Sequence, residues 1–321
     1  MVSVGDQSAT MTVLDTSLSP AVSTTPNITI NNNITNINSN NTTNNVVVNF
    51  QNSILKYDAS VTNDSSVRTT VIGNNNKVEG SSVNNTIVGT AGIDQLFGYA
   101  GNDRFLSSAG DDTFDGGEGL DTVTFEGSKA DFTLSKVGDR WTVTDRSTSG
   151  VREGTDTLVG VERLGFADKA VALDIEGVAG KAYRIYKAAF NRDPMSGDTA
   201  GLGFWIGQMD NAMDLIEVSS RFIDSSEFKS SYGTNPTNAQ FLTKLYQNVL
   251  GRQPEAEGYN WWLNELNTNP AKTKAKVLAD FAESNENKSG VLGLLGQGIT
   301  YDPWNDGGGD GGGGGGGGGG Y

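Results

Sequence analysis

Four aspartates recur at nine-residue intervals between Gly89 and Phe125, and they are the side chains in this sequence best placed to do chemistry together. Each follows a glycine by two residues and precedes an apolar residue by two. A glycine at that point permits a tight turn with positive φ, which brings backbone carbonyl oxygens close to the carboxylate. The apolar residue predicts a short strand with its side chain directed inward. The aspartates are Asp94, Asp103, Asp112 and Asp121, and the glycines are Gly92, Gly101, Gly110 and Gly119.

Two such nonapeptides complete an 18-residue coil with two turns and two strands, so alternate aspartates stack on the same side. At a strand spacing of about 4.8 Å, stacked carboxylates repel unless a cation lies between them. Calcium suits a mixture of carboxylate and carbonyl oxygens, whereas magnesium prefers small octahedral sites that keep water. The sequence therefore predicts about two principal calcium sites, between Asp94 and Asp112 and between Asp103 and Asp121, with a third against the Asn85 coil as an open alternative. The predicted metal-binding set is Gly92, Asp94, Gly101, Asp103, Gly110, Asp112, Gly117, Gly119 and Asp121.

This pattern resembles the RTX, or haemolysin-type calcium-binding, nonapeptide GGxGxDxUx. The resemblance is close over residues 89–124 and degenerate over 71–88, and the frame that begins at Gly116 matches in full. It implies a parallel β roll that calcium stabilises; the alternative is an array of Gly/Asp-rich turns without ions. The other frames depart at the second glycine, which is Thr90, Tyr99 or Ser108, and Ser107 replaces a first glycine.

Upstream of the aspartates the same position is held by amides, Asn76 and Asn85. Stacked amides can form a hydrogen-bonded ladder without metal, so we expect residues 71–88 to form coils that bind metal weakly or not at all. Asp111 and Asp115 lie beside the repeated position, and we expect them to be solvated edge charges rather than ligands.

The composition excludes several classes of function. The 321 residues contain no cysteine and no histidine, which excludes disulfides, thiolate sites, Ser-His-Asp triads and the H-E-x-x-H motif. A net charge of −15 argues against nucleic acid and anionic membranes as partners. The sequence has no apolar run of the ~20 residues that a membrane span needs. Its start lacks the basic and apolar regions of an ordinary secretory signal, which predicts a cytoplasmic protein or export by a route that ignores the N-terminus.

Around the repeat we expect a multidomain β + α protein, in which a parallel β-roll or β-solenoid with a β cap precedes an all-α domain. Residues 125–178 lose the nine-residue period and alternate instead, which predicts a β hairpin and further strands that cover the open end of the stack. The expected segments are a flexible leader (1–26), an Asn-rich arm that is either disordered or a strand ladder (27–70), the roll (71–124), the cap (125–178), a helical domain (179–300) and a flexible Gly-rich tail (301–321).

Residues 179–300 show helical spacing and an internal duplication. Tyr186 and Tyr246 lie 60 residues apart, and Phe204-Trp205 corresponds to Trp261-Trp262. The segment resembles a duplicated helical domain of unknown function that occurs beside RTX repeats in bacterial extracellular and surface-layer proteins and is distantly similar to phycobilisome linkers. Its aromatic residues are expected to pack between helices, with a sugar-stacking platform as the alternative. Arg192 and Arg252 are expected to cap backbone carbonyl groups.

Together these features predict a non-enzymatic, secreted, calcium-binding protein of a bacterial cell surface or extracellular matrix. The RTX resemblance implies type I secretion, although the poly-glycine end departs from the usual signal. Cell-surface polysaccharide or a surface-layer protein is the expected partner of the helical domain. Two alternatives stay open: a calcium-dependent extracellular enzyme or accessory fragment acting on polysaccharide, and an intracellular linker or scaffold.

Overall fold

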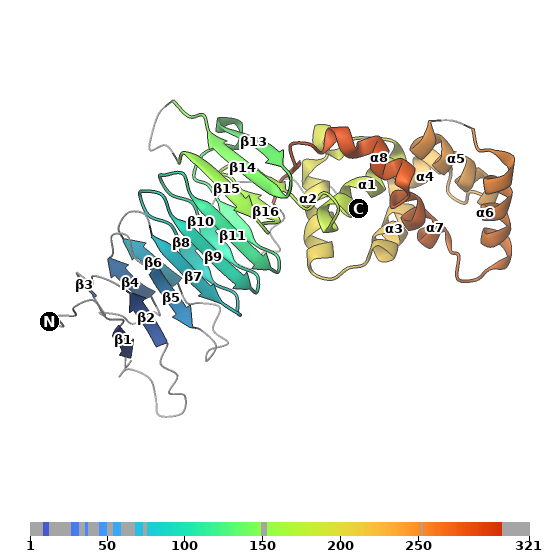
Figure 1. Cartoon of the computed structure of the whole chain (residues 1–321). Helices are drawn as coiled ribbons and strands as arrows, with labels where there is room; N and C mark the ends of the chain where they lie inside the picture. Colours follow the sequence, from blue (N-terminus) through green and yellow to red (C-terminus); the bar gives the residue numbers. More distant parts are fainter. Residues whose placement is uncertain are drawn as a thin grey trace. The chain divides into compact units, whose positions relative to one another are not determined.

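The computed structural model describes residues 76–148, 153–251 and 253–303, together with the backbone of six short strands between residues 9 and 72. The chain divides into two compact units, residues 1–173 and 174–321 (Figure 1). The division lies five residues before the predicted start of the helical domain. The first unit is built from strands and the second almost entirely from helices, which confirms the predicted β + α organisation.

Two sheets built mainly of parallel strands make up the first unit. In the first sheet the strand order is β1-β2-β5-β7-β9-β11-β15-β14-β13, and in the second β17-β16-β12-β10-β8-β6-β4-β3. The strands of the repeat are β7 (Lys77–Ser81), β8 (Thr86–Val88), β9 (Gln95–Ala100), β10 (Arg104–Leu106), β11 (Thr113–Glu118) and β12 (Thr122–Thr124).

Successive strands alternate between the two sheets, so the chain winds as a coil. Gln95 pairs with Lys77 and with Thr113, each 18 residues away, as the nonapeptide period predicts. The residue two positions after each repeated aspartate or asparagine points between the sheets and is at most 2% exposed along the whole repeat. These side chains form the core of the roll: Val78, Ile87, Leu96, Phe105, Phe114 and Val123.

The segment predicted to be a cap contains both a cap and a continuation of the roll. The hairpin of β13 (Phe132–Val137) and β14 (Arg140–Asp145) turns at Gly138, where φ is +61°, as the alternating pattern predicts. After it the chain rejoins the stack. Strand β15 (Thr155–Val159) pairs parallel with β11, and β16 (Arg163–Gly165) pairs parallel with β12. The short strand β17 (Ala170–Ala172) then pairs antiparallel with β16.

Aromatic side chains fill the end of the core beneath the hairpin. The rings of Phe125, Phe132 and Phe166 lie mutually 5.1–5.3 Å apart between centroids. All three side chains are buried. Such contacts bury large apolar areas and add about 0.5–1.5 kcal/mol per ring pair beyond burial alone. The hairpin therefore closes the apolar interior that the last coils would otherwise expose to water.

Six strands precede the repeat: β1 (Ala9–Thr12), β2 (Asn27–Asn31), β3 (Asn36–Ile37), β4 (Asn45–Asn49), β5 (Ile54–Asp58) and β6 (Arg68–Ile72). Strands β5 and β6 pair parallel with β7 and β8, so the Asn-rich arm includes strands that extend both sheets. Strand β1 falls within the expected leader. The rest of residues 1–26, the intervals between these strands, and the Gly-rich tail after residue 303 lie outside the described residues.

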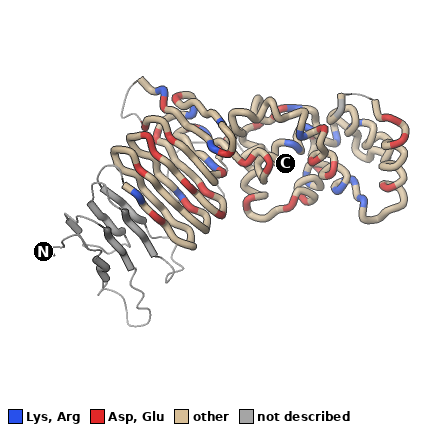
Figure 2. Tube along the Cα trace, in the orientation of Figure 1, with Lys and Arg blue, Asp and Glu red and all other residues tan. Residues whose placement is uncertain are grey.

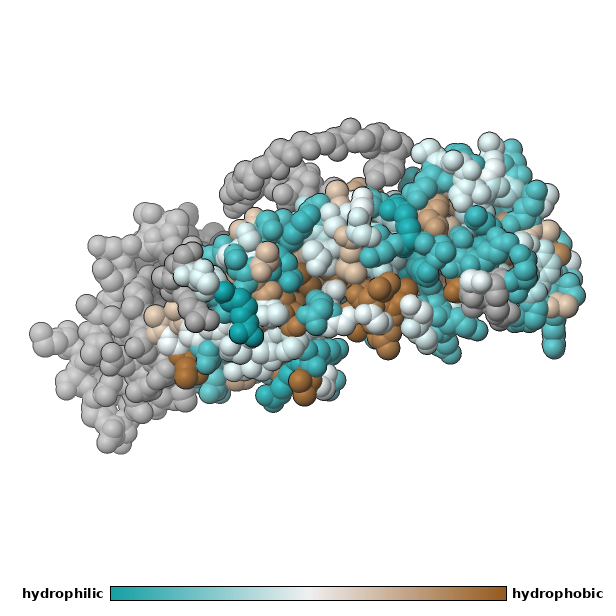
Figure 3. Space-filling model, turned by 90° about the horizontal axis from the view of Figure 1, so that it is seen from above, coloured by the Kyte–Doolittle hydropathy of each residue, from teal (hydrophilic) through white to brown (hydrophobic). Residues whose placement is uncertain are grey.

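The second unit is a twofold repetition of four helices. The first set is α1 (Val178–Phe190), α2 (Thr199–Asp210), α3 (Leu215–Asp224) and α4 (Ser226–Tyr232), and the second is α5 (Asn238–Leu250), α6 (Ala256–Thr268), α7 (Lys274–Ala282) and α8 (Asn285–Val291). Serine side chains cap corresponding helices. Ser225 accepts a hydrogen bond from the backbone N–H of the third residue of α4, and Ser284 accepts one from that of the third residue of α8. On the face shown in Figure 3 hydrophilic residues cover most of this unit.

The duplication extends to individual ring contacts. Tyr186 meets Phe222 edge-on at 4.9 Å, and Tyr246 meets Phe281 edge-on at 5.3 Å. The pairs Phe204–Trp205 and Trp261–Trp262 also pack edge-on, at 4.9 and 4.7 Å. Trp205 and Trp262 then pack on the two phenylalanines at 5.4 Å each. The predicted role of these rings in helix packing is confirmed, while Trp261 keeps 53% of its surface exposed.

A buried ion pair joins the first and last parts of the helical unit. The guanidinium of Arg184 on α1 is 1% exposed, contacts both carboxylate oxygens of Glu283 at 2.7 and 3.0 Å, and donates to the carbonyl oxygen of Ile175 at 2.6 Å. Lys288 approaches the same carboxylate at 3.2 Å. Burial alone would raise the pKa of Glu283, but the hydrogen bonds and charges of Arg184 and Lys288 outweigh it and lower the pKa below 4.5.

We therefore expect Glu283→Gln to lower the free energy of unfolding of the helical unit by about 3 kcal/mol at pH 7, because it leaves the buried Arg184 charge uncompensated. A lowered folded pKa contributes stability above pH 4.5 that is lost as the pH falls through the folded value. The difference in the free energy of unfolding between wild type and variant should thus become smaller at acidic pH. Urea denaturation at several pH values would measure it. The matched control is Glu217→Gln, whose ion pair with Arg221 is exposed and contributes at most about 1 kcal/mol. Equal effects of the two changes would contradict the prediction.

Candidate metal centre

The four repeated aspartates lie on the turns that precede β9, β10, β11 and β12, and each is at most 2% exposed. The glycines two residues before them have φ between +110° and +145°, which confirms the predicted turn conformation. The turns form two rows, which we call edge A and edge B. Edge A carries Asn76, Asp94 and Asp112, and edge B carries Asn85, Asp103 and Asp121. Figure 2 shows acidic residues recurring from coil to coil.

Each aspartate binds the backbone of the preceding coil through one oxygen. On edge A, Asp94 Oδ1 accepts the Asn76 N–H at 2.8 Å and Asp112 Oδ1 accepts the Asp94 N–H at 2.8 Å. On edge B, Asp103 Oδ1 accepts from Asn85 at 2.6 Å and Asp121 Oδ1 accepts from Asp103 at 2.7 Å. The structure therefore stacks Asp94 with Asp112 and Asp103 with Asp121, as predicted, and the stacking is held by hydrogen bonds as well as by strand pairing.

The second carboxylate oxygen on edge B has no hydrogen-bond partner. Oδ2 of Asp103 and Oδ2 of Asp121 are buried and unpaired among the described residues. A methyl group added at Gly98 would lie 2.2 Å from Asp103 Oδ2 and 2.6 Å from the Gly116 carbonyl oxygen. One added at Gly116 would lie 2.5 Å from Asp121 Oδ2 and 2.1 Å from the Gly160 carbonyl oxygen. Glycine at these two positions thus leaves a carboxylate and a carbonyl oxygen facing the same point.

Hydroxyl groups surround the second oxygen on edge A. Thr90 donates both its backbone N–H and its hydroxyl to Asp94 Oδ2, each at 2.6 Å. The Ser108 hydroxyl lies 2.6 Å from the Thr90 carbonyl oxygen and 3.2 Å from Asp112 Oδ2. A methyl group added at Gly89 would meet this hydroxyl oxygen at 2.5 Å. Thr90 and Ser108 are the residues that replace the second glycine of the nonapeptide in these two frames.

Two further acidic residues, Asp156 and Glu162, extend the rows beyond the predicted repeat. The Asp112 N–H donates to Asp156 Oδ1 at 2.9 Å, and the Asp121 N–H donates to Glu162 Oε2 at 2.9 Å. Gly154 has φ of +89° and lies against the carbonyl oxygen of Gly110. Gly110 lies against the carbonyl oxygen of Gly92 in the same way. The sequence did contain the signal, since Gly154-Thr155-Asp156-Thr157-Leu158 repeats the Gly-x-Asp-x-apolar pattern. The hairpin inserted before it breaks the period and conceals it.

The buried positions of Asp103, Asp112 and Asp156 disfavour the charged form of their carboxylates and raise the pKa of each. Burial raises the pKa of Asp103 and of Asp112 to about 7, against the effect of the backbone hydrogen bonds that they accept. Burial also raises the pKa of Asp156 to about 9, with Asp112 and Glu153 adding to the rise. Asp111, expected to be solvated, is exposed but accepts the Thr155 N–H at 2.8 Å, and Asp115 is half-buried on β11.

The donor set fits calcium. Within the described ranges, no three acidic side chains lie close enough together to hold a metal by themselves. An ion at these turns would take one or two carboxylates and complete its shell with backbone carbonyl oxygens, which calcium accepts among its 6–8 oxygen ligands. The unpaired Oδ2 atoms of Asp103 and Asp121 are groups that cost free energy when buried without a partner, and a cation would satisfy them.

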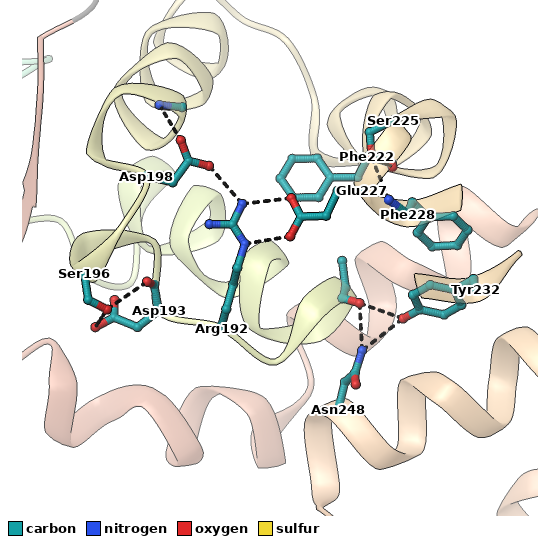
Figure 4. Close-up of polar contacts among 12 residues, drawn as sticks. Arg192, Asp193, Ser196, Asp198, Phe222, Ser225, Glu227, Phe228, Tyr232 and Asn248 are labelled. Carbon is teal, nitrogen blue, oxygen red and sulfur yellow. Dashed lines mark hydrogen bonds and ion pairs between the residues drawn. The ribbon is translucent and has the colours of Figure 1, made fainter. Parts of the chain in front are cut away.

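A second polar cluster lies in the helical unit (Figure 4). Arg192 contacts Asp198 at 2.9 Å and Glu227 at 2.9 and 3.0 Å, and its guanidinium stacks over the ring of Tyr186 at 4.6 Å. The predicted contact of Arg192 with backbone carbonyl groups is therefore wrong, because two carboxylates from α4 and the start of α2 are within reach. Arg252 lies outside the described residues. The cluster ties the α1–α2 connection to α4.

A stack of 18-residue coils with buried aspartates on glycine turns defines a parallel β roll of the calcium-binding type. Residues 79–114 and 107–123 match the family model described as the RTX calcium-binding nonapeptide repeat, and residues 219–291 match a domain of unknown function (DUF4214). The chain thus carries RTX repeats followed by a DUF4214 domain, as the sequence predicted. These matches indicate a calcium-binding repeat protein.

Among solved structures, the extracellular lipase LipA from Serratia marcescens is similar to this chain at 20% identity, with a TM-score of 0.27. The match covers 41% of this chain and 18% of the lipase, so the chain spans less than a fifth of its length. No curated protein matches the chain significantly. Among the described residues, none of the helices combines the length and apolarity needed to cross a membrane.

Proposed function

We propose that this chain is a secreted, calcium-binding structural or interaction protein of a bacterial cell surface or extracellular matrix. Calcium would drive folding of the β roll, and the helical unit would serve as the interaction module. The observation that carries the proposal is the pair of buried, unpaired carboxylate oxygens of Asp103 and Asp121, each facing a backbone carbonyl oxygen of the next coil. The match to the RTX repeat supports the same conclusion.

The physical role of the ion follows from the difference between the folded and unfolded chains. In the unfolded chain the aspartates are far apart and hydrated, whereas the roll brings them together in buried rows. Because calcium binds the assembled turns and not the separated ones, its binding free energy becomes folding free energy. Such a protein stays poorly folded where calcium is scarce and folds where calcium is plentiful, which suits export to the outside of the cell.

The test is circular dichroism of the full chain during calcium titration. Calcium added to chelated protein should increase the β-sheet signal, while an isolated fragment of residues 174–303 should show the same helical signal in chelator and in calcium. That fragment is the matched control, because the helical unit contains none of the candidate ligands. Absence of binding at millimolar calcium in equilibrium dialysis would refute the proposal, and loss of helix from the fragment on chelation would refute the separation into units. Immunoblots of culture supernatant, surface and cytosolic fractions test the location.

The helical unit's proposed partner is a cell-surface polysaccharide or a surface-layer protein. The half-exposed Trp261 beside Trp262 offers an aromatic surface on α6, and Lys272 lies 5.3 Å from the Trp262 ring. Aromatic rings with one exposed face are the usual platforms for sugar rings and for protein contacts. Co-sedimentation with purified cell walls, compared between wild type and Trp261→Ala, tests this part of the proposal separately from calcium binding.

A further inference from the structure

The two edges of the roll differ in the second residue of each frame, and on edge A Ser107 also replaces a first glycine. On edge A that residue is Thr90 or Ser108, and on edge B it is Tyr99 or Gly117. The hydroxyl-bearing side chains of edge A contact the aspartates of their own frames, at 2.6 Å for Thr90 with Asp94 and 3.2 Å for Ser108 with Asp112. Neither Asp103 nor Asp121 receives such a contact on its second oxygen.

From this contrast we infer that the roll binds calcium along edge B only and that edge A is closed by hydroxyl groups. The inference rests on the proposed calcium-dependent function and narrows it to particular turns. It assigns two ions: one between the Asp103 turn and the next coil at Gly116, the other between the Asp121 turn and Gly160. The second of these uses a turn that lies beyond the recognisable nonapeptides.

On edge A the second carboxylate oxygens of Asp94 and Asp112 lie against hydroxyl groups, and one coil earlier the buried amide oxygen of Asn76, which has no hydrogen-bond partner, is neutral. Asp94 Oδ2 accepts two hydrogen bonds from Thr90, and the Thr90 carbonyl oxygen is itself contacted by the Ser108 hydroxyl. That hydroxyl oxygen occupies the place, next to Gly89, where edge B presents carboxylate and carbonyl oxygens together. At the end of the row the Ser107 hydroxyl lies 3.5 Å from Asp156 Oδ2. An ion would have to displace these donors before it could bind.

On edge B the row of unpaired carboxylate oxygens is limited to Asp103 and Asp121. One coil before Asp103, the amide oxygen of Asn85 accepts the Ser81 N–H at 2.7 Å, so the neutral amide is satisfied within its own turn. At the other end, Glu162 accepts the Asp121 N–H through Oε2, as the aspartates do along the row. The two unpaired carboxylate oxygens between these limits set the expected stoichiometry at two.

The experiment is calorimetric titration and equilibrium dialysis of the full-length chain with calcium chloride, comparing two double variants. Asp103→Asn with Asp121→Asn should reduce bound calcium from two ions to none, or weaken binding about a hundredfold, because a neutral amide replaces the charged ligand in each site. Asp94→Asn with Asp112→Asn should leave the stoichiometry at two and the Kd within about threefold of wild type. Asparagine keeps the oxygen that accepts the N–H of the preceding coil, and circular dichroism verifies that each variant folds.

A third variant tests the hydroxyl groups directly and does not depend on removing any carboxylate. Thr90→Gly with Ser108→Gly restores the second glycine of both edge A frames, and it should add at least one bound ion. Equal loss of calcium in the two asparagine variants, or an unchanged stoichiometry in the glycine variant, would overturn the one-edge assignment while leaving calcium binding intact. Wild-type protein that binds no calcium at all would instead refute the proposed function on which the inference rests.

Discussion

Addition of calcium to the chelated full-length protein should raise the melting temperature of the β unit by about 10–30 °C. Each site saturated at 100–1,000 times its Kd contributes about 2.7–4.1 kcal/mol, and 1 kcal/mol shifts a domain of this size by about 2–4 °C. Two sites therefore suffice for a shift of that size. Differential scanning calorimetry resolves it from the melting of the helical unit, which should not move.

Magnesium at equal ionic strength is the control, because it screens charge equally but takes fewer ligands in a stricter octahedral arrangement. Its shift should be no more than a small fraction of that with calcium. Similar shifts with both ions would mean that screening, rather than coordination, stabilises the turns. The roll would then be an acidic turn array whose carboxylates repel one another.

Phe114→Ala should lower the free energy of unfolding of the β unit by about 3–5 kcal/mol, the cost of a large cavity in a packed core. Phe114 is completely buried, and its ring meets that of Phe105 edge-on at 5.6 Å between centroids. In a stack only neighbouring coils and the opposite sheet line this space, so few side chains can move to fill it. Urea denaturation in saturating calcium measures the loss.

The matched control for this cavity is Ile93→Ala, a similar truncation on a turn of the same roll where the side chain is 58% exposed. It should change stability by no more than about 0.5 kcal/mol. A large loss for Ile93→Ala, or a loss below about 1 kcal/mol for Phe114→Ala, would show that the core between the sheets is not packed as described.

The nonapeptide period alone predicted the coils, because three residues of each repeat determine three properties of the fold. The glycine fixes the turn, the aspartate side chain accepts a hydrogen bond from the preceding coil, and the apolar residue takes the core position. The same period hid the turns at Gly154 and Gly160, since an inserted hairpin separates them from the repeat. What could not be predicted was the closure of edge A. It depends on where the hydroxyl groups of Thr90 and Ser108 point, and only the stacked coils determine that.

In the helical unit, the contacts of residues that recur in both halves could be predicted from the sequence, whereas the side-chain partners of Arg192 could not. The pairing of Tyr186 with Tyr246 and of the two tryptophan-bearing segments follows from matched positions, and the ring contacts repeat accordingly. The role of Arg192 depended instead on which acceptors the fold brings near it. Glu227 lies 35 residues away in sequence, so spacing could not reveal the contact.

The β13–β14 hairpin shows how freely this architecture accepts inserted segments. The N–H of Asp94 reaches its carboxylate partner 18 residues away, and the N–H of Asp112 makes an equivalent bond across 44 residues, at 2.8 and 2.9 Å. Closing the longer loop costs only about 0.8 kcal/mol more, because loop-closure entropy grows with the logarithm of length. The register of a coil is therefore set by its hydrogen bonds to the neighbouring coil and not by the number of residues between them. A foreign loop or a small domain inserted between two coils would leave the coils on either side in register. The roll could therefore serve as a scaffold for inserted segments.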